Sequence, residues 1–318
     1  MINPVYFSII IPLYNKQDYI KQTIESVLKQ TVESFEVLVI DDGSTDDSAN
    51  VVASIADSRV RLIKQVNKGV SAARNNGIRE ATGKYVCFLD ADDMWSNNFL
   101  EVVKNLFTKF PNAGFVCPSY QVDYGNRILR PRWRGVDLDK DGLVTDFYEM
   151  ATAPFWICNS SCIAIKREVL LNLDYWFPEN ETVYEDFDLW IRLGAMYPVA
   201  HSNTICSTYR RITEKNARTA HTKKVVYSAT YMNTLNRLMQ SPDLSAKQKK
   251  NVHEIIDRRM VPYIFSLLSS NRRKFAKDIL KTWRPTKKYK IYRISLKCAA
   301  YMPNRIINAV QTIRYKLF

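Results

Sequence analysis

The chain has 318 residues, 46% of them apolar, which is enough for a sizeable core and more than one structural unit. Its net charge of +14 is uneven, because residues 247–318 hold 19 Lys or Arg and three Asp or Glu, whereas the preceding residues hold 27 and 29. No window is long, apolar and uncharged enough for a membrane span, and the first residues lack the basic and apolar segments of a signal peptide. We therefore expect a cytoplasmic protein with a near-neutral front part and a basic appendage.

The spacing of the cysteines agrees with this compartment. Six cysteines are scattered along the sequence, and Cys158 and Cys162 are the one pair with a metal-binding spacing. A zinc site of this kind needs a second pair, which is absent. Reduced thiols in the core of a cytoplasmic protein are the better interpretation.

Apolar runs and helical periodicities alternate over the first 110 residues. Buried strands are predicted at residues 7–12, 35–40, 60–63 and 85–89. Helices with one apolar face are predicted at residues 16–30, around 51–55, from 67 to 83 and at 97–110. Strands that alternate with helices at this spacing predict βαβ units and a largely parallel sheet.

Two of these strands run directly into carboxylates. Asp41 and Asp42 follow the second strand, and the segment Asp90–Asp93 follows the fourth. In open α/β sheets, ligands bind at the carboxyl ends of the strands. In an extended backbone, Asp90 and Asp92 would point to the same side and repel each other unless a hard divalent cation lay between them. The alternative is a solvated acidic turn that caps the following helix.

The middle of the chain is less regular. Residues 119–155 are predicted to be an irregular basic and aromatic loop, either a substrate lid or a plain surface excursion. Strands are predicted at 161–165 and 199–209, with a helix from residue 184 to 193 between them. Glu185 and Asp186 stand in the first turn of that helix, where the helix dipole favours carboxylates, so capping is the simplest explanation for them.

From about His221 onward the pattern is helical throughout. We therefore divide the chain into a domain of residues 1–220 and a basic α-helical region of residues 221–318. The excess of basic residues indicates an anionic partner, either nucleic acid or an anionic membrane surface. The front domain is slightly acidic and has no recognisable nucleic-acid module, which argues against nucleic acid.

Five sets of residues, in this order and spacing, resemble the motifs of family 2 glycosyltransferases with the GT-A fold. They are Ser8–Asn15, Val39–Asp46, Asn67–Gly69 with Ala73–Ile78, Ala81–Tyr85 leading into Asp90–Asp93, and Glu185–Leu193. Together they span about residues 5–211 and leave the basic tail uncovered. The resemblance implies a Rossmann-like, mostly parallel α/β fold of nucleotide-diphospho-sugar transferases, followed by a basic helical extension.

The resemblance also implies an activity. It is the inverting transfer of one sugar from a nucleotide-diphosphate donor, UDP by default, to a hydroxyl of a glycan or lipid-linked acceptor. Such transfer builds bacterial surface polysaccharide, namely lipopolysaccharide O-antigen, capsule or exopolysaccharide. No Gln-x-x-Arg-Trp sequence follows Asp186, and its absence favours single additions over processive synthesis.

Carried over residue by residue, the resemblance assigns Asp186 as the catalytic base. It assigns Asp92, with Asp90, as ligands of a divalent ion, Mn²⁺ or Mg²⁺, that bridges the diphosphate. Nucleotide-side roles fall on Pro12, Tyr14, Asp41, Asp42, Arg74, Asp90, Glu185 and Arg210. Many relatives have a His shortly after the last strand. Here His221 is the nearest, and it either completes the metal site or lies on the surface, in which case Arg210 or Arg211 would contact the diphosphate.

The basic tail fits a location at the membrane. A lipid-linked acceptor would place the protein on the inner face of the cell membrane as a peripheral protein. Lys and Arg clusters with Trp283, Tyr289, Tyr292 and Tyr301 suit such an anionic interface. The alternatives are a solvated helical appendage and an oligomer contact.

Other functions fit the sequence less well. A sugar nucleotidyltransferase would begin with a Gly-rich phosphate loop, and residues 11–15 contain no Gly. A dinucleotide dehydrogenase would carry G-x-G-x-x-G after the first strand, and this sequence does not. A catalytically retired scaffold with this fold would not need to retain both Asp92 and Asp186, which are present.

Overall fold

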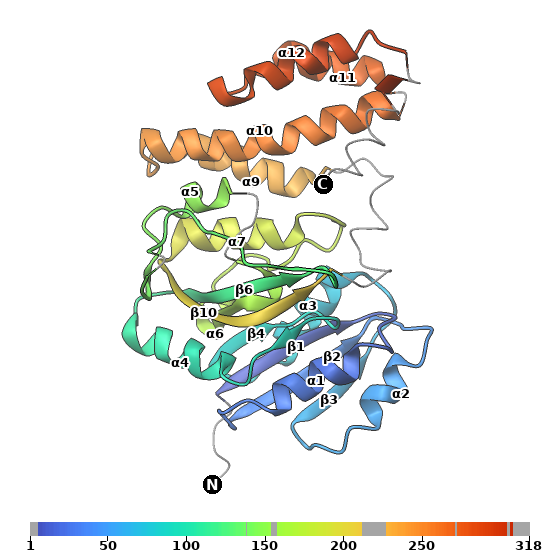
Figure 1. Cartoon of the computed structure of the whole chain (residues 1–318), viewed down its shortest axis with the longest axis vertical. Helices are drawn as coiled ribbons and strands as arrows, with labels where there is room; N and C mark the ends of the chain where they lie inside the picture. The colour runs from blue at the N-terminus through green and yellow to red at the C-terminus, as the bar shows by residue number, and fades with distance from the viewer. Residues whose placement is uncertain are drawn as a thin grey trace. The chain divides into compact units, whose positions relative to one another are not determined.

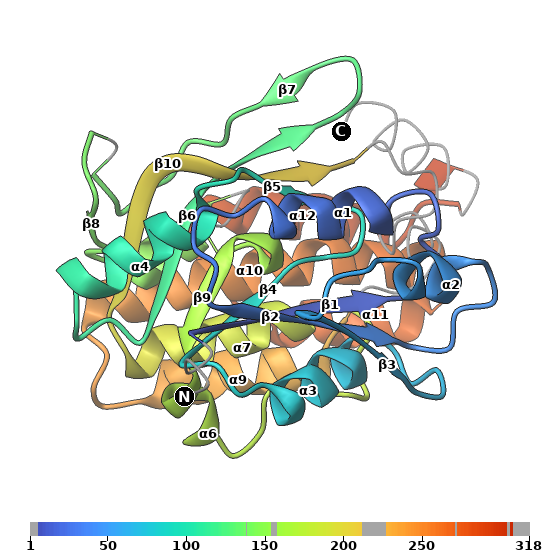
Figure 2. The same cartoon turned by 90° about the horizontal axis from the view of Figure 1, so that it is seen from below.

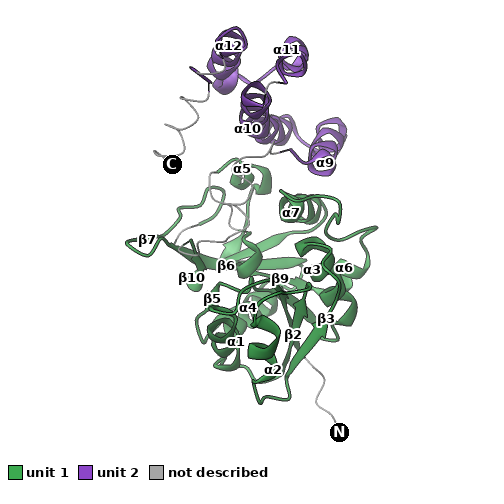
Figure 3. Ribbon diagram, turned by 90° about the vertical axis from the view of Figure 1, so that its right-hand side faces the viewer, with its two compact units in different colours: residues 1–214 green, residues 215–318 purple. Residues whose placement is uncertain are grey.

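The computed structural model describes residues 6–137, 139–153, 158–211, 227–270, 272–303 and 306–307. The chain divides into two compact units, residues 1–214 and 215–318 (Figure 3). The boundary expected at residue 220 falls among residues 212–226, outside the described residues, and so does His221. Over the described ranges, no helix combines the length and the apolar character needed to cross a membrane.

The first unit is an α/β structure whose described strands form one ten-stranded sheet (Figure 1). The strands are β1 (Phe7–Leu13), β2 (Phe35–Asp41), β3 (Val60–Lys64), β4 (Tyr85–Phe88), β5 (Met94–Trp95), β6 (Phe115–Asp123), β7 (Ile128–Leu129), β8 (Gly142–Leu143), β9 (Ile163–Lys166) and β10 (Val199–Arg210). The helices are α1 (Ile20–Leu28), α2 (Ser48–Ala53), α3 (Val70–Glu80), α4 (Phe99–Lys109), α5 (Phe147–Ala151), α6 (Arg167–Leu171) and α7 (Glu185–Met196), with a 3-10 turn η1 at Ser160–Cys162.

The sheet is mixed. Its strand order is β3-β2-β1-β4-β9-β6-β10-β5, with β7 paired to β6 and β8 paired to β10. The first four strands in this order are parallel, whereas β9 is antiparallel to both β4 and β6. The predicted α/β class is therefore correct, but the sheet is less parallel than predicted because β9 and the short strands β5, β7 and β8 enter it in the opposite direction.

The central strand β1 runs one residue further than predicted. The sequence prediction ended it at Pro12, yet β1 includes Leu13 and is buried throughout. Along this strand, the carbonyl of Ile10 accepts from Leu89 on the β4 side, and the carbonyl of Leu13 accepts from Asp42 on the β2 side. The backbone of Pro12 points to the same side as that of Ile10, and β4 has already ended there. The lack of an N–H at Pro12 therefore costs no hydrogen bond between strands.

Helices cover both faces of this sheet. Figure 2 shows α1 over one face of β1 and β2, and α3 over the other. Helix α3 approaches β1 closely at Gly77, where an added Cβ would lie 2.3 Å from Cγ2 of Ile10. A larger residue would push the helix off the strand, because a packed interior has no space to absorb it. This close approach fixes the position of Arg74, one turn earlier on α3.

Over its described residues, the stretch 119–155 is more regular than predicted. It contains the end of β6, the short strands β7 and β8, and helix α5. Pro118 and Ser119 interrupt the apolar run of β6, so its periodicity does not reveal a strand. The strand forms because β9 and β10 pair with it on its two sides. The prediction of an irregular loop is therefore wrong for this part.

The second unit is helical. Its elements are α9 (Ala229–Gln240), α10 (Ala246–Ser269), α11 (Arg273–Thr282), a 3-10 turn η2 (Lys287–Tyr289) and α12 (Lys290–Ala299). Trp283, expected at a membrane surface, is buried in the core of this unit, and that expectation is wrong. Its indole N–H donates to the fully buried carboxylate of Asp257 at 2.9 Å, and Asp257 also accepts from the backbone N–H of Thr286 at 2.8 Å.

Candidate active site

The acidic segment after β4 is a tight turn. The backbone N–H of Asp93 donates to the carbonyl of Asp90 at 3.0 Å, which closes the turn just after the buried strand. The prediction of an extended segment is therefore wrong. The structure instead gives Asp90 and Asp92 different cationic partners, which are described below.

Asp93 is the buried anchor of this turn, a role that the sequence analysis missed. Its carboxylate accepts from Oγ of Ser161 at 2.5 Å and from the backbone N–H of Arg210 at 2.9 Å. Burial, with the nearby charges of Asp90 and Asp92, raises the pKa of Asp93 well above its ordinary value. Asp93 thus ties η1 and the end of β10 to the acidic turn. The available signal was its place as the third carboxylate after a buried strand.

Arg74 joins the acidic turn to the start of α7. Its guanidinium lies 2.8 Å from the carboxylate of Asp90 and 3.2 Å from that of Glu185, and the side chain is only 4% exposed. It also lies over the ring of Phe177, 5.2 Å from the ring centroid. Burial alone would lower the pKa of Arg74, but the charges of Asp90, Glu185 and Asp186 outweigh it and raise the pKa. Three predicted site residues, Asp90, Arg74 and Glu185, are therefore brought together here.

Glu185 and Asp186 form the first turn of α7. The residue before them, Tyr184, has a φ of +62°, a left-handed backbone conformation that residues other than Gly seldom adopt. Burial and the charge of Asp186 raise the pKa of Glu185 to about 7, although Arg74 opposes the shift. Burial also raises the pKa of Asp186, against the lowering effects of Arg74 and of the backbone N–H of Phe187.

The contacts of Asp186 hold one of its oxygens and leave the other in a looser contact. Oδ1 accepts from the backbone N–H of Phe187 at 2.8 Å, and Oδ2 lies 3.5 Å from Oγ of Ser160 on η1. This contact pairs the N–H of Phe187 in the first turn of α7, but the N-cap residue is Tyr184, so Asp186 does not cap the helix. The N–H contact of Oδ1 and acid–base chemistry through Oδ2 are compatible at Asp186.

Asp92 is paired with a lysine that the sequence analysis did not single out. Nζ of Lys16, in the loop after β1, lies 2.5 Å from Oδ2 of Asp92, and both side chains are mostly buried. A carboxylate that already holds a cation fits a divalent metal, which prefers oxygen ligands. Over the described residues, no group of three or more His, Cys, Asp or Glu side chains forms a complete metal cage. The roles of Asp92 and Asp90 as metal ligands stay predictions, in which oxygen atoms of a phosphate-bearing ligand would complete the coordination.

The loop after β1 and the end of β2 form the predicted nucleobase side. Pro12 is buried in β1, and Tyr14 directly after it is 48% exposed. Asn15 then turns the chain with a φ of +51°, which Asn tolerates better than most residues, and its Oδ1 accepts from the backbone N–H of Thr45 at 2.8 Å. Lys16 follows this turn, so the turn directs the loop toward the acidic segment.

The two carboxylates at the end of β2 are both buried but have different partners. Asp42 accepts from the backbone N–H groups of Lys68 and Gly69, each at 2.8 Å, and thereby holds the loop that precedes α3. Asp41 accepts from the backbone N–H of Ser44 at 3.0 Å. The loop-holding role of Asp42 was not predicted, and the nucleobase roles of both residues stay predictions.

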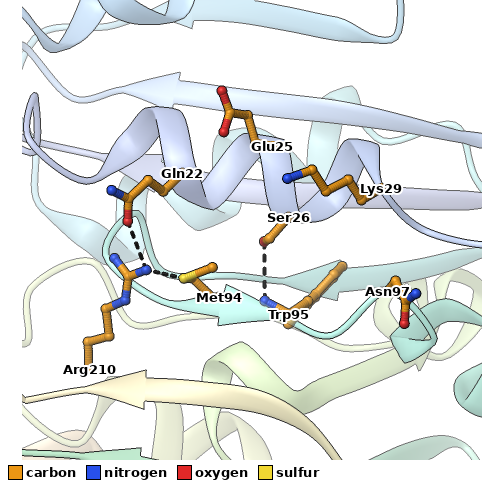
Figure 4. Close-up of a pocket in the computed structure, with 8 residues that line it drawn as sticks. All are labelled: Gln22, Glu25, Ser26, Lys29, Met94, Trp95, Asn97 and Arg210. Atoms are coloured by element: carbon orange, nitrogen blue, oxygen red, sulfur yellow. Dashed lines mark hydrogen bonds between the residues drawn. The ribbon is translucent and has the colours of Figure 1, made fainter.

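Arg210 directs its side chain toward α1. Its guanidinium donates to Oε1 of Gln22 at 3.0 Å and contacts the sulfur of Met94, while its backbone N–H binds Asp93. These side chains line a shallow hollow of about 260 Å³ between α1 and β5 (Figure 4). The predicted contact of Arg210 with a diphosphate would require the guanidinium to leave Gln22. The neighbouring Arg211 donates to the hydroxyl of Tyr124 at 2.7 Å.

Comparison with known proteins decides the family. Residues 8–173 match the model of the family described as Glycosyl transferase family 2. The chain belongs to glycosyl transferase family 2. Within this family 2 chain, the match covers the acidic turn, α3 and η1, and ends before α7.

Curated relatives agree with the family. The UDP-Glc:alpha-D-GlcNAc-diphosphoundecaprenol beta-1,3-glucosyltransferase WfgD of Escherichia coli is 31% identical over 206 residues, which cover 64% of this chain and 76% of WfgD. Three uncharacterised glycosyltransferases of Rickettsia species are 32–35% identical, but the chain spans only 26–31% of their length.

Solved structures agree with the fold. The structure of residues 1–349 of S. aureus TarS, in complex with UDP-GlcNAc, is similar with a TM-score of 0.69 and 16% identity, over 98% of this chain and 91% of that one. The mannosyltransferase PcManGT from Pyrobaculum calidifontis, in complex with GDP-Man and Mn²⁺, has a TM-score of 0.59 and 19% identity, over 98% of this chain and 87% of PcManGT. The predicted family and the predicted GT-A fold are therefore confirmed.

Proposed function

We propose that this family 2 protein transfers one sugar, with inversion, from a nucleotide-diphosphate donor to a hydroxyl group of a glycan or lipid-linked acceptor. The observation that carries the proposal is the cluster around Arg74. This buried cation pairs with Asp90 of the acidic turn and with Glu185, directly beside the candidate base Asp186. Donor-side carboxylates and an acid–base group with a raised pKa thus meet at the sheet edge where α/β proteins bind ligands.

In the proposed reaction, the acceptor hydroxyl oxygen forms a bond to the anomeric carbon on the face opposite the diphosphate. The bond from that carbon to the diphosphate oxygen breaks, and its electron pair leaves with the nucleoside diphosphate. The hydroxyl proton passes to Oδ2 of Asp186, because Oδ1 is held by the N–H of Phe187. Burial makes Asp186 a stronger base than a solvated aspartate, and general-base catalysis contributes roughly 10²–10⁴-fold.

A divalent ion, Mn²⁺ or Mg²⁺, is the proposed cofactor. When bound, it would act as a Lewis acid on the charge that develops on the departing diphosphate. Asp92, with Asp90, would hold it, and Lys16 would give up its place on Oδ2 of Asp92. PcManGT, which shares the fold, was solved with Mn²⁺ and a nucleotide sugar, which supports this assignment.

The donor base and the acceptor are supported by different observations. The exposed ring of Tyr14 lies just past the end of β1, where Leu13 pairs with Asp41 at the end of β2, and it offers a surface for a nucleobase near Pro12, Asp41 and Asp42. TarS was solved with UDP-GlcNAc, and WfgD is named for UDP-Glc and a diphosphoundecaprenol-linked sugar. UDP and a lipid-linked acceptor in bacterial surface-polysaccharide synthesis are therefore our working assignments.

A lipid-linked acceptor would bring the protein to the inner face of the cell membrane, as a peripheral protein. The charge of residues 247–318, with 19 basic and three acidic residues, suits an anionic lipid surface. We propose no nucleic-acid partner, because residues 1–246, with 27 basic and 29 acidic residues, are slightly acidic and their sequence has no recognisable nucleic-acid module.

The experiment that tests the function is thermal stabilisation by UDP, GDP, TDP and CMP, each with and without Mn²⁺. A ligand that binds the folded state alone raises the melting temperature by mass action. We expect one nucleotide diphosphate to give an Mn²⁺-dependent shift that Asp92→Ala abolishes. The matched control is Asp186→Asn, which keeps that shift and loses sugar transfer to the acceptor. The absence of a shift with every nucleotide, or unchanged transfer by Asp186→Asn, would contradict the proposal.

A further inference from the structure

Among the described residues, helix α12 packs against the rest of its unit through one side. Leu296 within the helix and Ala300 just after it are buried in the core of the second unit, together with residues of α10 and α11. They lie four residues apart and therefore on the same face. This face attaches α12 to the core of the second unit, so the opposite face of the helix points away from that core.

The opposite face of α12 is apolar and exposed. Ile291, Ile294 and Cys298 follow each other at spacings of three and four residues, which places them on one stripe. Ile291 is 67% exposed, Ile294 is 63% exposed and Cys298 is exposed as well. We call these three residues the outer face of α12. Such a stripe marks a contact surface when it is contiguous and rimmed by polar residues.

Lysines rim this outer face. Lys290 and Lys297 lie seven residues apart along its flank, and both are exposed. The surrounding sequence is strongly basic, since residues 272–303 contain eleven Lys or Arg and one Asp. Tyr301 just beyond the helix is 78% exposed, and Nζ of Lys277 lies 3.9 Å from its ring centroid. Apolar, aromatic and cationic groups are therefore combined within about three helical turns.

We propose that the outer face of α12 inserts into the surface of an anionic lipid bilayer, with the helix lying in the plane of the interface. This deepens the peripheral location proposed above by naming the element that makes the contact. Interfacial helices combine an apolar stripe with flanking Lys and Arg, and their binding grows with the apolar area inserted and with the anionic lipid content. No helix among the described residues spans a membrane, so a surface contact is the kind of attachment that α12 offers.

Charge favours lipid over a second copy of the chain as the occupant. A symmetric dimer through this face would place Lys290 and Lys297 of one copy near the same residues of the other. Like charges at such a contact oppose association, whereas anionic headgroups neutralise them. The second copy is therefore the competing outcome that the experiment has to exclude.

Cys298 permits a direct measurement. It lies on the outer face, and it is exposed whereas the other five cysteines are buried, so a thiol-reactive fluorophore modifies this position selectively. The full chain, labelled at Cys298, is mixed with vesicles of phosphatidylcholine alone or with about 30% phosphatidylglycerol. We expect a blue shift and quenching by brominated lipid with the anionic vesicles only. No shift with either vesicle would overturn the proposal.

Unlabelled variants test which residues carry the binding. Ile291→Ser with Ile294→Ser should weaken sedimentation with anionic vesicles by more than about tenfold, because it removes most of the inserted apolar area. The matched control, Leu171→Ser with Met196→Ser, removes two apolar residues of the first unit that are 54% and 55% exposed, and it should bind like the wild type. Unchanged binding by the α12 variant would contradict the proposal.

Two further measurements separate the alternatives. Analytical ultracentrifugation without lipid should give the same mass for the wild type and the α12 variant, whereas a dimer lost in the variant would identify a second copy as the occupant. Asp186→Asn should bind vesicles normally and lose transfer. The α12 variant should retain transfer to a short-chain, water-soluble acceptor analogue. Failure of the membrane contact is thereby distinguished from failure of the proposed activity.

Discussion

Replacing Arg74 with methionine should destabilise the first unit, and more strongly above neutral pH than below it. The guanidinium is 4% exposed and pairs with Asp90 at 2.8 Å and with Glu185 at 3.2 Å. Removing one partner of a buried ion pair costs about 3–5 kcal/mol, because the remaining charge is left without compensation. Asp90 is 31% exposed and keeps part of its hydration, so we expect the lower end, about 3 kcal/mol, at high pH.

The pH dependence follows from Glu185. Its pKa of about 7 in the folded protein is above its ordinary value of 4.5, so its contribution to stability is complete below the ordinary value and is lost as the pH rises through 7. Arg74 lowers this pKa, so its removal raises the pKa further. At pH 6, Glu185 is largely protonated in both proteins, and the deficit comes mainly from Asp90. At pH 8.5, Glu185 of the wild type is charged and has the Arg74 cation beside it, whereas Glu185 of the variant has lost that cation. The loss of unfolding free energy in the variant is therefore larger at pH 8.5.

The assay is urea unfolding of the full chain at pH 6 and pH 8.5, followed by circular dichroism. Arg74→Lys is the control that keeps a positive charge but not the two-pronged geometry, and it should fall between the wild type and Arg74→Met. Combining Arg74→Met with Glu185→Gln should remove most of the pH dependence, because the titrating group is gone. A deficit below about 1 kcal/mol, or one that is equal at the two pH values, would refute the reasoning.

Three further predictions concern other parts of the chain. Lys16→Met should raise the affinity for Mn²⁺ without nucleotide by about tenfold, because the lysine no longer competes with the metal for Asp92. Electron paramagnetic resonance of Mn²⁺ measures this affinity, and an unchanged value would argue against a metal at Asp92. Tyr14→Ala should weaken binding of the donor nucleotide about tenfold in calorimetry, with the melting temperature unchanged because the ring is half exposed; full binding would exclude stacking on this ring. Asp257→Ala should cost about 3 kcal/mol in the second unit, because it leaves the indole N–H of Trp283 unpaired in the core; an unaltered near-ultraviolet spectrum and stability would contradict this role.

The sequence by itself was sufficient for the family, the fold class and the position of carboxylates at the ends of β2 and β4. Strands β1, β2 and β4 consist mostly of apolar residues, and such runs are recognised directly in the sequence. The carboxylates that follow β2 and β4 are local features too, so their place at one edge of the sheet was predictable. Where a neighbouring element decides the outcome, prediction was less accurate, as for Pro12 within β1 and for β6 with its interrupted apolar run.

The tertiary structure alone decided which charges meet. Arg74 and Glu185 are 111 residues apart in the chain, and Lys16 and Asp92 are 76 residues apart, so no local pattern pairs them. In the sequence, Trp283 is typical of a surface aromatic residue in a basic segment. In the structure it is buried, and its indole N–H donates to the buried carboxylate of Asp257 on α10. Hydrophobic periodicity is a property of neighbouring residues, whereas these pairs depend on strand order and on how closely helices approach, which only the folded chain determines.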